Sequence, residues 1–140
     1  MALDIEFLSR CIGALQSAHD SLQGREPDDE FYEVFRAAAV KEFEIVLEQS
    51  GNLLRKRLRT FMASHRQADQ LTFKDIFRHA ARHGLITLDT AERWCVYRDN
   101  RNDTAHNYGA GFAEATLAIL PGFIQDARDL AGVIAEGSDD

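Results

Sequence analysis

The chain has 140 residues, a hydrophobic fraction of 45% and a formal net charge of −7. These values fit one soluble domain with its own core, and the acidic balance argues against a protein that coats nucleic acid. No apolar run approaches the roughly 18 residues of a membrane-spanning helix, so we expect no membrane partner. The N-terminus carries acidic residues where a signal peptide would be basic, and Cys11 and Cys95 are isolated. We therefore expect a cytoplasmic protein with two buried thiols.

The positive charge is concentrated in the middle of the chain. Residues 1–54 hold 4 basic and 11 acidic side chains, residues 55–101 hold 11 and 5, and residues 102–140 hold 1 and 7. A local basic surface can hold a phosphate backbone while the rest of the protein repels it. The same pattern also fits helix faces that are solvated and bind nothing.

The pattern of apolar residues predicts an all-α fold, an up-down antiparallel bundle of four to five helices in a single domain over residues 1–140. Turn-forming clusters are few, and only two prolines occur in the chain. The predicted helices cover residues 3–23, 28–64 and 72–84, a stretch that starts at Thr87 or Asp89, and residues 112–135.

Several residues mark the expected helix ends. Asp28 is a candidate N-cap for the second helix, and residues 65–71 read as a polar linker. Thr72 and Asp75 have the spacing of a capping box, and Gly84 suits a helix C-terminus. Pro121 should kink the last helix because proline removes a helical hydrogen bond.

The search for catalytic motifs leaves one segment. His79 and His83 have a spacing that can bind zinc, but a third ligand and the HExxH glutamate are missing, so we expect no metal and no cofactor. The sequence contains no glycine-rich phosphate loop, GxSxG turn or CxxC pair. Residues 98–108, which are rich in Arg, Asn, Asp, His and Tyr, are where chemistry is expected.

Within that segment, Arg101 and His106 are five residues apart, but Arg78 and His83 show the same spacing, so spacing alone is not diagnostic. On an ideal helix, two positions five residues apart differ by about 140° around the axis. We therefore expect the segment to bend, or the long arginine to reach around, so that both side chains touch one phosphate. Asn102 lies four residues before the histidine and can orient it.

Residues 101–108, Arg-Asn-Asp-Thr-Ala-His-Asn-Tyr, resemble the Arg-x4-His-x-Tyr motif of HEPN domains. The nearest branch is the HEPN subunit encoded beside a minimal nucleotidyltransferase, also called the nucleotidyltransferase substrate-binding family. Residues 36–44 resemble that branch's second-helix signature, and residues 83–86 with Trp94 resemble its approach to the motif. The similarity spans roughly residues 33–130. It departs further along the second helix, where the branch usually has a Trp-Lys pair and residues 51–56 of this chain read Gly-Asn-Leu-Leu-Arg-Lys.

The resemblance implies a ribonuclease that needs no metal and acts as a homodimer. Its target would be RNA, either tRNA or mRNA, and its cognate minimal nucleotidyltransferase would silence it by attaching AMP to a tyrosine. An imidazole suits general acid–base work near neutral pH, and a guanidinium suits the charge that develops on a phosphorane. The residues implied are Arg101, His106 and Asn102 for catalysis, Tyr108 for modification, and Arg98, Arg82 and Arg78 for RNA phosphates.

Each of these residues also has a structural interpretation. Arg101 can bridge helix ends, His106 can cap a helix, and Tyr108 can pack in the core, where Trp94 and Tyr97 are also expected. Two other functions therefore stay open. One is a non-catalytic subunit that presents nucleotide or another substrate to a nucleotidyltransferase. The other is a helical dimer with structural duties only.

Overall fold

The computed structural model describes residues 3–106 and 110–136, with side chains described for residues 3–102 and 111–136. Within these residues the regular structure is entirely helical, which confirms the predicted all-α class. The elements are α1 (Glu6–Leu22), α2 (Tyr32–Leu58), the 3-10 turn η1 (Arg59–Phe61), α3 (His65–Asp69), α4 (Phe73–Arg82), α5 (Leu88–His106) and α6 (Ala110–Glu136).

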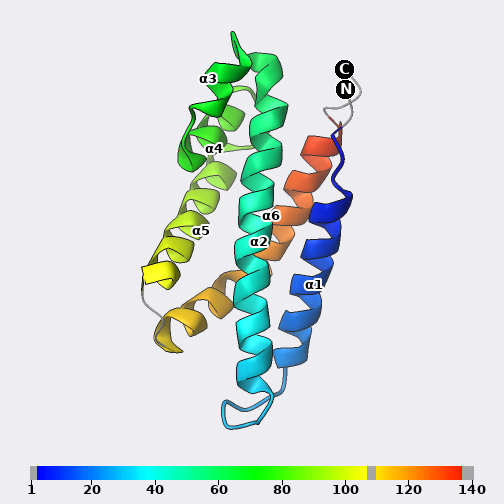
Figure 1. Cartoon of the computed structure of the whole chain (residues 1–140), viewed down its shortest axis with the longest axis vertical. Coiled ribbons are helices and arrows are strands. Elements are labelled where there is room, and N and C mark those ends of the chain that lie inside the picture. The colour runs from blue at the N-terminus through cyan, green and yellow to red at the C-terminus, as the bar shows by residue number, and fades with distance from the viewer. Residues whose placement is uncertain (1–2, 107–109, 137–140) are drawn as a thin grey trace.

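The central helix of the bundle is α2, which packs against α1, α4 and α6 (Figure 1). Of the last two long helices, α5 packs mainly on α4, whereas α6 packs mainly on α2; both also contact each other. Large aromatic side chains fill the core, and the predicted core residue Trp94 is fully buried. No helix in the described ranges is long and apolar enough to cross a membrane. The fully buried aromatic residues are Trp94, Phe43, Phe77 and Phe123.

Local sequence signals set several helix ends as predicted. The Thr72 hydroxyl accepts a hydrogen bond from the Asp75 backbone N–H at 3.2 Å, which caps α4. Gly84 ends the same helix with φ +76°, and the backbone N–H of Leu85 returns to the Ala80 carbonyl at 3.0 Å. The Thr87 hydroxyl accepts from the Thr90 N–H at 3.1 Å, so α5 begins at the first of the two predicted positions.

Other expectations for the first half of the chain were wrong. Asp28 does not cap α2. The carboxylate of Asp29 accepts the backbone N–H of Phe31 at 2.8 Å instead, and the helix starts one residue later. The predicted linker contains the short helix α3, which the hydroxyl of Ser64 caps by accepting from the Gln67 N–H. Cys95 is only half-buried, in contrast to the buried Cys11.

The last two helices frame the motif. The fifth helix is continuous from Leu88 through His106, so the bend expected between Arg101 and His106 is absent. Pro121 lies inside α6, which changes direction along its length (Figure 1). The predicted kink in this helix is therefore present, because proline cannot donate the backbone hydrogen bond of a regular turn.

Gly51 lets α4 approach α2 closely. A Cβ atom at residue 51 would lie 2.7 Å from Cε2 and 2.9 Å from Cδ2 of Phe73. The Phe73 ring also packs on Phe77, with ring centroids 4.9 Å apart. The absence of a side chain at residue 51 therefore leaves the space that the Phe73 ring fills.

A buried carboxylate ties α5 to α6. Asp126 accepts two hydrogen bonds from Arg93, both at 2.9 Å, and one from the Tyr97 hydroxyl at 2.5 Å. Burial opposes ionisation of Asp126, but the hydrogen bonds from Arg93 and Tyr97 outweigh it and hold the pKa of this carboxyl below its ordinary value. Burial, together with the same carboxylate, raises the pKa of Tyr97. The result is a charged crosslink between the helix that carries the motif and the helix that follows it.

We expect Gly51→Ala to lower the melting temperature, although alanine is the better helix former by up to about 1 kcal/mol. The added methyl group must displace the Phe73 ring, and overpacking of this kind costs about 1–3 kcal/mol. The matched control is Gly13→Ala in α1, where an added Cβ meets no atom within 4 Å and should stabilise the protein. If both variants melt at a higher temperature than wild type, the contact with Phe73 does not explain why residue 51 is a glycine.

We expect Asp126→Asn to destabilise the protein by about 2 kcal/mol near neutral pH, because it removes the charge that Arg93 and Tyr97 bind. The folded-state pKa of Asp126 is lowered, so its contribution is present above the unfolded value of about 3.9 and is lost as the pH falls through the folded-state pKa. The stability gap to wild type should be constant above about pH 5 and shrink below about pH 4. The control is Asp129→Asn, an exposed position on the same helix. If the difference in stability between Asp126→Asn and wild type does not change down to pH 3, the lowered pKa of Asp126 is contradicted.

Candidate functional site at the end of α5

Arg101 lies near the C-terminal end of α5, and the structure leaves part of its hydrogen-bonding capacity unused. Its side chain is half-buried, and its Nε atom is buried without a hydrogen-bond partner among the described residues. A buried, unpaired donor on a guanidinium costs free energy unless another group completes it. The Nε atoms of Arg55 and Arg59 are buried without a partner among the described residues in the same way; at Arg101 the free donor belongs to the motif. Asn102, the next residue, is exposed.

Arg98, one turn earlier, has partners within the chain. Its Nη1 atom forms an ion pair with Glu48 of α2, and its guanidinium lies over the Phe73 ring, 5.0 Å from the centroid. The side chain keeps 28% exposure. Arg98 is thus partly neutralised and oriented, rather than a free cation, and a phosphate at this position has to compete with Glu48.

Hydrogen bonds hold the chain in place just before and just after the motif. The Thr116 hydroxyl, which is fully buried in α6, donates to Oδ1 of Asn100 at 2.7 Å. Near the start of α6, Oε1 of Glu114 accepts from the Tyr32 hydroxyl at 2.7 Å and from Arg36 at 3.1 Å. Residues 100 and 114 are therefore both fixed, one to α6 and the other to α2.

In the cluster of Tyr32, Arg36 and Glu114, the hydrogen bonds stabilise the charged form of the carboxylate. The hydrogen bond from Tyr32, supported by Arg36, lowers the pKa of Glu114, and the same hydrogen bond raises the pKa of Tyr32. Glu114 therefore stays ionised at neutral pH, and the start of α6 is held to α2 by a carboxylate with two donors. Because α6 begins four residues before Glu114, this cluster holds the first turns of α6 against α2.

The two remaining phosphate candidates lie farther along the bundle. Arg78 and Arg82 are exposed on α4, and both line a groove that α4 forms with the first half of α5. The structure therefore brings Arg98 next to Arg101 but places Arg78 and Arg82 toward the start of α5. Lys74, one turn before Arg78, pairs with Asp99 of α5 at 2.6 Å.

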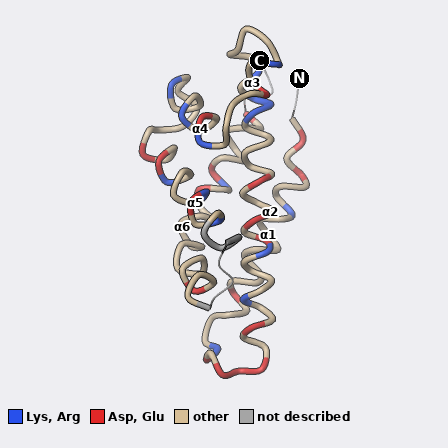
Figure 2. Tube along the Cα trace, turned by 60° about the vertical axis from the view of Figure 1, so that its left-hand side comes forward, with Lys and Arg blue, Asp and Glu red and all other residues tan. Residues whose placement is uncertain are grey.

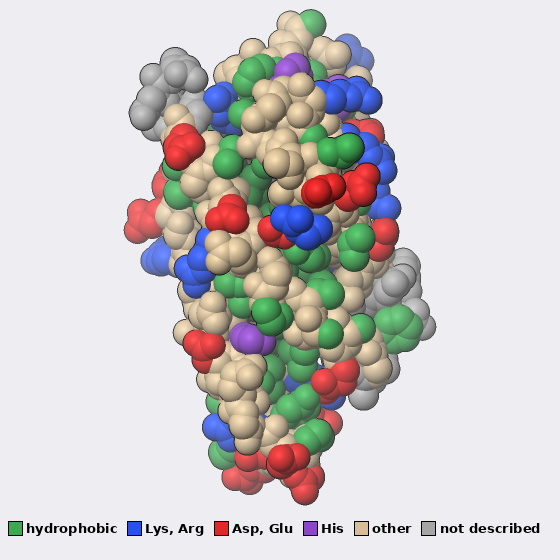
Figure 3. Space-filling view, turned by 180° about the vertical axis from the view of Figure 1, so that it is seen from behind, with side chains coloured by type: hydrophobic (Ala, Val, Ile, Leu, Met, Phe, Trp, Pro, Cys, Tyr) green, Lys and Arg blue, Asp and Glu red, His purple; other side chains and the backbone are tan. Residues whose placement is uncertain are grey.

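The charges separate along the long axis of the molecule. Basic positions lie along α4 and at the adjoining end of α2, whereas the loop between α1 and α2 is acidic (Figure 2). Acidic side chains also crowd this loop end in the view from behind, and the rest of that face is mixed (Figure 3). The charge blocks read from the sequence therefore form distinct regions, and the basic one adjoins α5.

The structure describes the predicted catalytic residues to different extents. Arg101 and Asn102 are described in full, and His106 is placed on α5 by its backbone alone. Tyr108 lies outside the described residues. On the continuous helix the backbone positions of Arg101 and His106 differ by about 140° around the axis.

Sequence reasoning missed the groups that support the site. Glu48, which pairs with Arg98, is 50 residues away in sequence, and the Tyr32–Glu114 hydrogen bond spans 82 residues. Local periodicity carries no signal for such pairings. A single hint was available, since Arg36 stands in the second-helix stretch that resembles the family signature.

Comparisons with known proteins agree with this architecture. Over residues 3–135 the sequence matches the family described as nucleotidyltransferase substrate binding protein like. It is 35% identical over 94 residues to a Haemophilus influenzae protein named probable ribonuclease HepT. The aligned part is 67% of this chain and 63% of that protein, so the match spans somewhat less than two thirds of the relative.

Two solved structures share the fold. One, from Haemophilus influenzae, is described as revealing the fold of a substrate binding domain of a nucleotidyltransferase. It has a TM-score of 0.81 and 26% identity, with 94% of this chain and 98% of that chain covered. The other, from Thermus thermophilus, has a TM-score of 0.73 and 23% identity, with 91% and 98% covered. The chain belongs to the nucleotidyltransferase substrate-binding protein-like family.

Proposed function

We propose that this protein is a metal-independent endoribonuclease, the toxin of a toxin–antitoxin pair, with Arg101 and His106 as its catalytic residues. The observation that carries the proposal is the half-buried Arg101, whose Nε has no partner among the described residues, on the same helix as His106. The relative named probable ribonuclease HepT supports it. The RNA substrate is tRNA or mRNA.

The proposed reaction uses the ribose next to the scissile phosphate. A neutral imidazole at His106 removes the proton of the 2′-hydroxyl, and the 2′-oxygen attacks the adjacent phosphorus. The bond from phosphorus to the 5′-oxygen breaks, and that oxygen takes up a proton from an imidazolium or from water, so that the proton removed in the first step is balanced. The products are a 2′,3′-cyclic phosphate and a 5′-hydroxyl. The Arg101 guanidinium holds the phosphorane oxygens, where negative charge develops, and Asn102 orients the imidazole.

The continuous helix gives a reason for a homodimer. Two backbone positions about 140° apart on one helix do not present their side chains to a single point from one direction. A second copy of the chain that adds its own α5 to a shared cleft doubles the number of cationic and imidazole groups there. Arg98 lies one turn from Arg101 and contributes further positive potential to this cleft. We propose that the active species is this dimer.

The proposed regulation acts on Tyr108. A cognate minimal nucleotidyltransferase transfers AMP from ATP, so that the tyrosine oxygen bonds to the α-phosphorus and pyrophosphate leaves. The attached group brings negative charge and bulk next to Arg101 and His106. RNA is then excluded by repulsion and by occlusion.

A second candidate function is favoured by one of the solved structures. The Haemophilus influenzae fold is described as a substrate binding domain of a nucleotidyltransferase, which suggests a non-catalytic partner subunit. In that case Arg101 binds the phosphate of a nucleotide or another substrate for the partner enzyme. The two functions differ in whether the purified protein cleaves RNA by itself.

We expect Arg101→Ala to lower the rate of RNA cleavage by about 10²–10³-fold and His106→Ala by about 10²–10⁴-fold, measured on a labelled RNA in excess EDTA. The controls are Arg128→Ala and His65→Ala, which remove the same side-chain types at exposed positions on α6 and α3. Melting temperatures should show that all four variants are folded.

The assay also separates the two candidate functions. If wild type and His106→Ala leave RNA equally intact while the protein forms a stable complex with the nucleotidyltransferase, the substrate-binding function holds and the ribonuclease proposal fails. Full cleavage by folded His106→Ala would also contradict the catalytic assignment.

We expect Tyr108→Phe to keep its ribonuclease activity but to escape silencing by the nucleotidyltransferase and ATP, because the phenyl ring lacks the oxygen that accepts AMP. Intact-mass spectrometry should show AMP added to wild type and none added to the variant. The control is Tyr97→Phe, at a buried tyrosine of α5 that should leave AMP transfer unchanged. Equal labelling of wild type and Tyr108→Phe would move the modification to another residue.

A further inference from the structure

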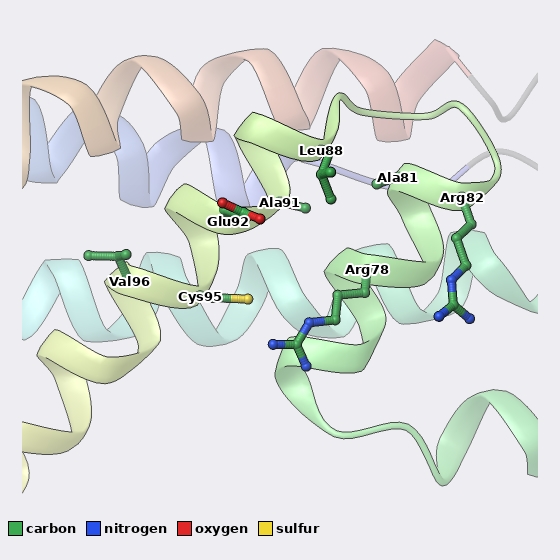
Figure 4. Close-up of a pocket in the computed structure, with 8 residues that line it drawn as sticks. All are labelled: Arg78, Ala81, Arg82, Leu88, Ala91, Glu92, Cys95 and Val96. Atoms are coloured by element: carbon green, nitrogen blue, oxygen red, sulfur yellow. The ribbon is translucent and has the colours of Figure 1, made fainter.

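A groove runs between α4 and the first half of α5, on the basic side of the molecule (Figure 4). Its volume is about 600 Å³, within the range of small-molecule sites. Arg78 and Arg82 come from α4, and α5 contributes Leu88, Cys95 and Val96. The sulfur of Cys95 points into the space between the two helices (Figure 4).

The floor of the groove is apolar and incompletely covered. Leu88 is 63% exposed and Val96 57%, unusually high values for large aliphatic side chains on a packed helix. Alanines at residues 81 and 91 complete the floor and leave it shallow. An apolar surface of this kind gains free energy when a flat apolar group covers it.

The rim of the groove is cationic. The side chain of Arg78 is 55% exposed, and its contact with Asp75 is long, at 3.8 Å. Arg82 is exposed and forms no ion pair with a described residue. One acidic side chain, Glu92, lines the groove on the α5 side, so the lining is positive by one charge. Cations above an apolar floor suit a ligand with phosphates on one side and a ring on the other.

The groove is continuous with the end of α5 that carries the motif. Cys95 precedes Arg101 by six residues, about 9 Å of axial rise on α5. Between them lie the ion pair of Lys74 with Asp99 and the side chain of Arg98, which Glu48 partly neutralises. Six residues also turn by about 120° around the helix axis, so a nucleic-acid strand bound at Arg101 reaches the groove by passing over Arg98.

We propose that the α4–α5 groove binds a single-stranded part of the RNA next to the scissile phosphate. Successive bases cover Leu88 and Val96, which lie about 12 Å apart along α5, and the flanking phosphates lie on Arg78 and Arg82. Single-stranded RNA fits better than a duplex because paired bases cannot turn toward an apolar floor. This inference rests on the proposed ribonuclease function for its substrate, and it assigns Arg78 and Arg82 to binding rather than to the chemical step.

The test measures RNA binding in the His106→Ala background, so that it does not depend on cleavage. The probe is a fluorescein-labelled single-stranded RNA of about 20 nucleotides, compared with the same sequence as a duplex. The double variant Arg78→Glu/Arg82→Glu should weaken binding of the single strand by about tenfold or more and lower the salt dependence by about two ions. Glu92→Gln should tighten binding, because it removes the negative charge of the groove.

The matched control is Lys56→Glu/Arg66→Glu, which makes the same change in net charge at exposed positions outside the groove. Cys95 gives a second readout, since the other cysteine, Cys11, is buried. Burial raises the pKa of the Cys95 thiol, so maleimide labelling is run at mildly alkaline pH. RNA should slow the labelling of Cys95.

Three results would overturn the proposal. The two charge-reversal variants could weaken RNA binding equally, or RNA could leave the labelling of Cys95 unchanged. The groove variant could also keep RNA binding but lose dimerisation or the nucleotidyltransferase complex, which would make the groove a protein interface. If RNA protects Cys95 of the wild-type protein from labelling but is never cleaved, the ribonuclease proposal fails and the groove assignment stands.

Discussion

The structure depends on how firmly α5 is held to α6. Trp94 and Tyr97 project from α5 into the core, where both pack edge-on against Phe123 of α6, with ring centroids 5.4 and 5.0 Å away. Asp126, one turn beyond Phe123, receives the Tyr97 hydroxyl and the guanidinium of Arg93. Aromatic packing and a charged crosslink thus act on the same two turns. The helix that ends in the motif is fixed before Arg101 is reached, and the candidate site inherits that rigidity.

The sequence allowed the fold to be predicted well wherever the signal was local. Helical periodicity, the Thr72 cap and the φ-positive Gly84 each act within a few residues, and the structure confirms all three. Predictions failed where two signals compete over one turn. Asp28 and Asp29 both precede α2, but neither caps it: Asp29 accepts the N–H of Phe31 in the preceding turn, and no side chain caps the helix.

The candidate site could be predicted only in part, for a related reason. The residues proposed to carry the chemistry lie in one short segment, so a motif can suggest them. Their supports come from distant helices, as the pairs Arg98–Glu48 and Asn100–Thr116 show, and no local pattern encodes those contacts. The continuity of α5 through His106 was also missed, because the five-residue spacing favoured a bend as one way to bring Arg101 and His106 to one phosphate.

One departure from the family pattern has a structural explanation. The departure lies in residues 51–56, and at Gly51 the ring of Phe73 occupies the space that a side chain would take. Phe73 in turn lies beneath Arg98. Gly51 is therefore linked, through Phe73, to the orientation of a cation next to the motif.

The central claim is that Arg101 and His106, gathered from two copies of α5 in a shared cleft, act on a single phosphodiester without a metal ion. The chemistry of the RNA ends tests this claim most directly. After incubation with the purified protein in EDTA, mass spectrometry of the fragments should show 2′,3′-cyclic phosphate and 5′-hydroxyl ends. Fragments with 3′-hydroxyl and 5′-phosphate ends, or RNA that stays intact, would contradict it.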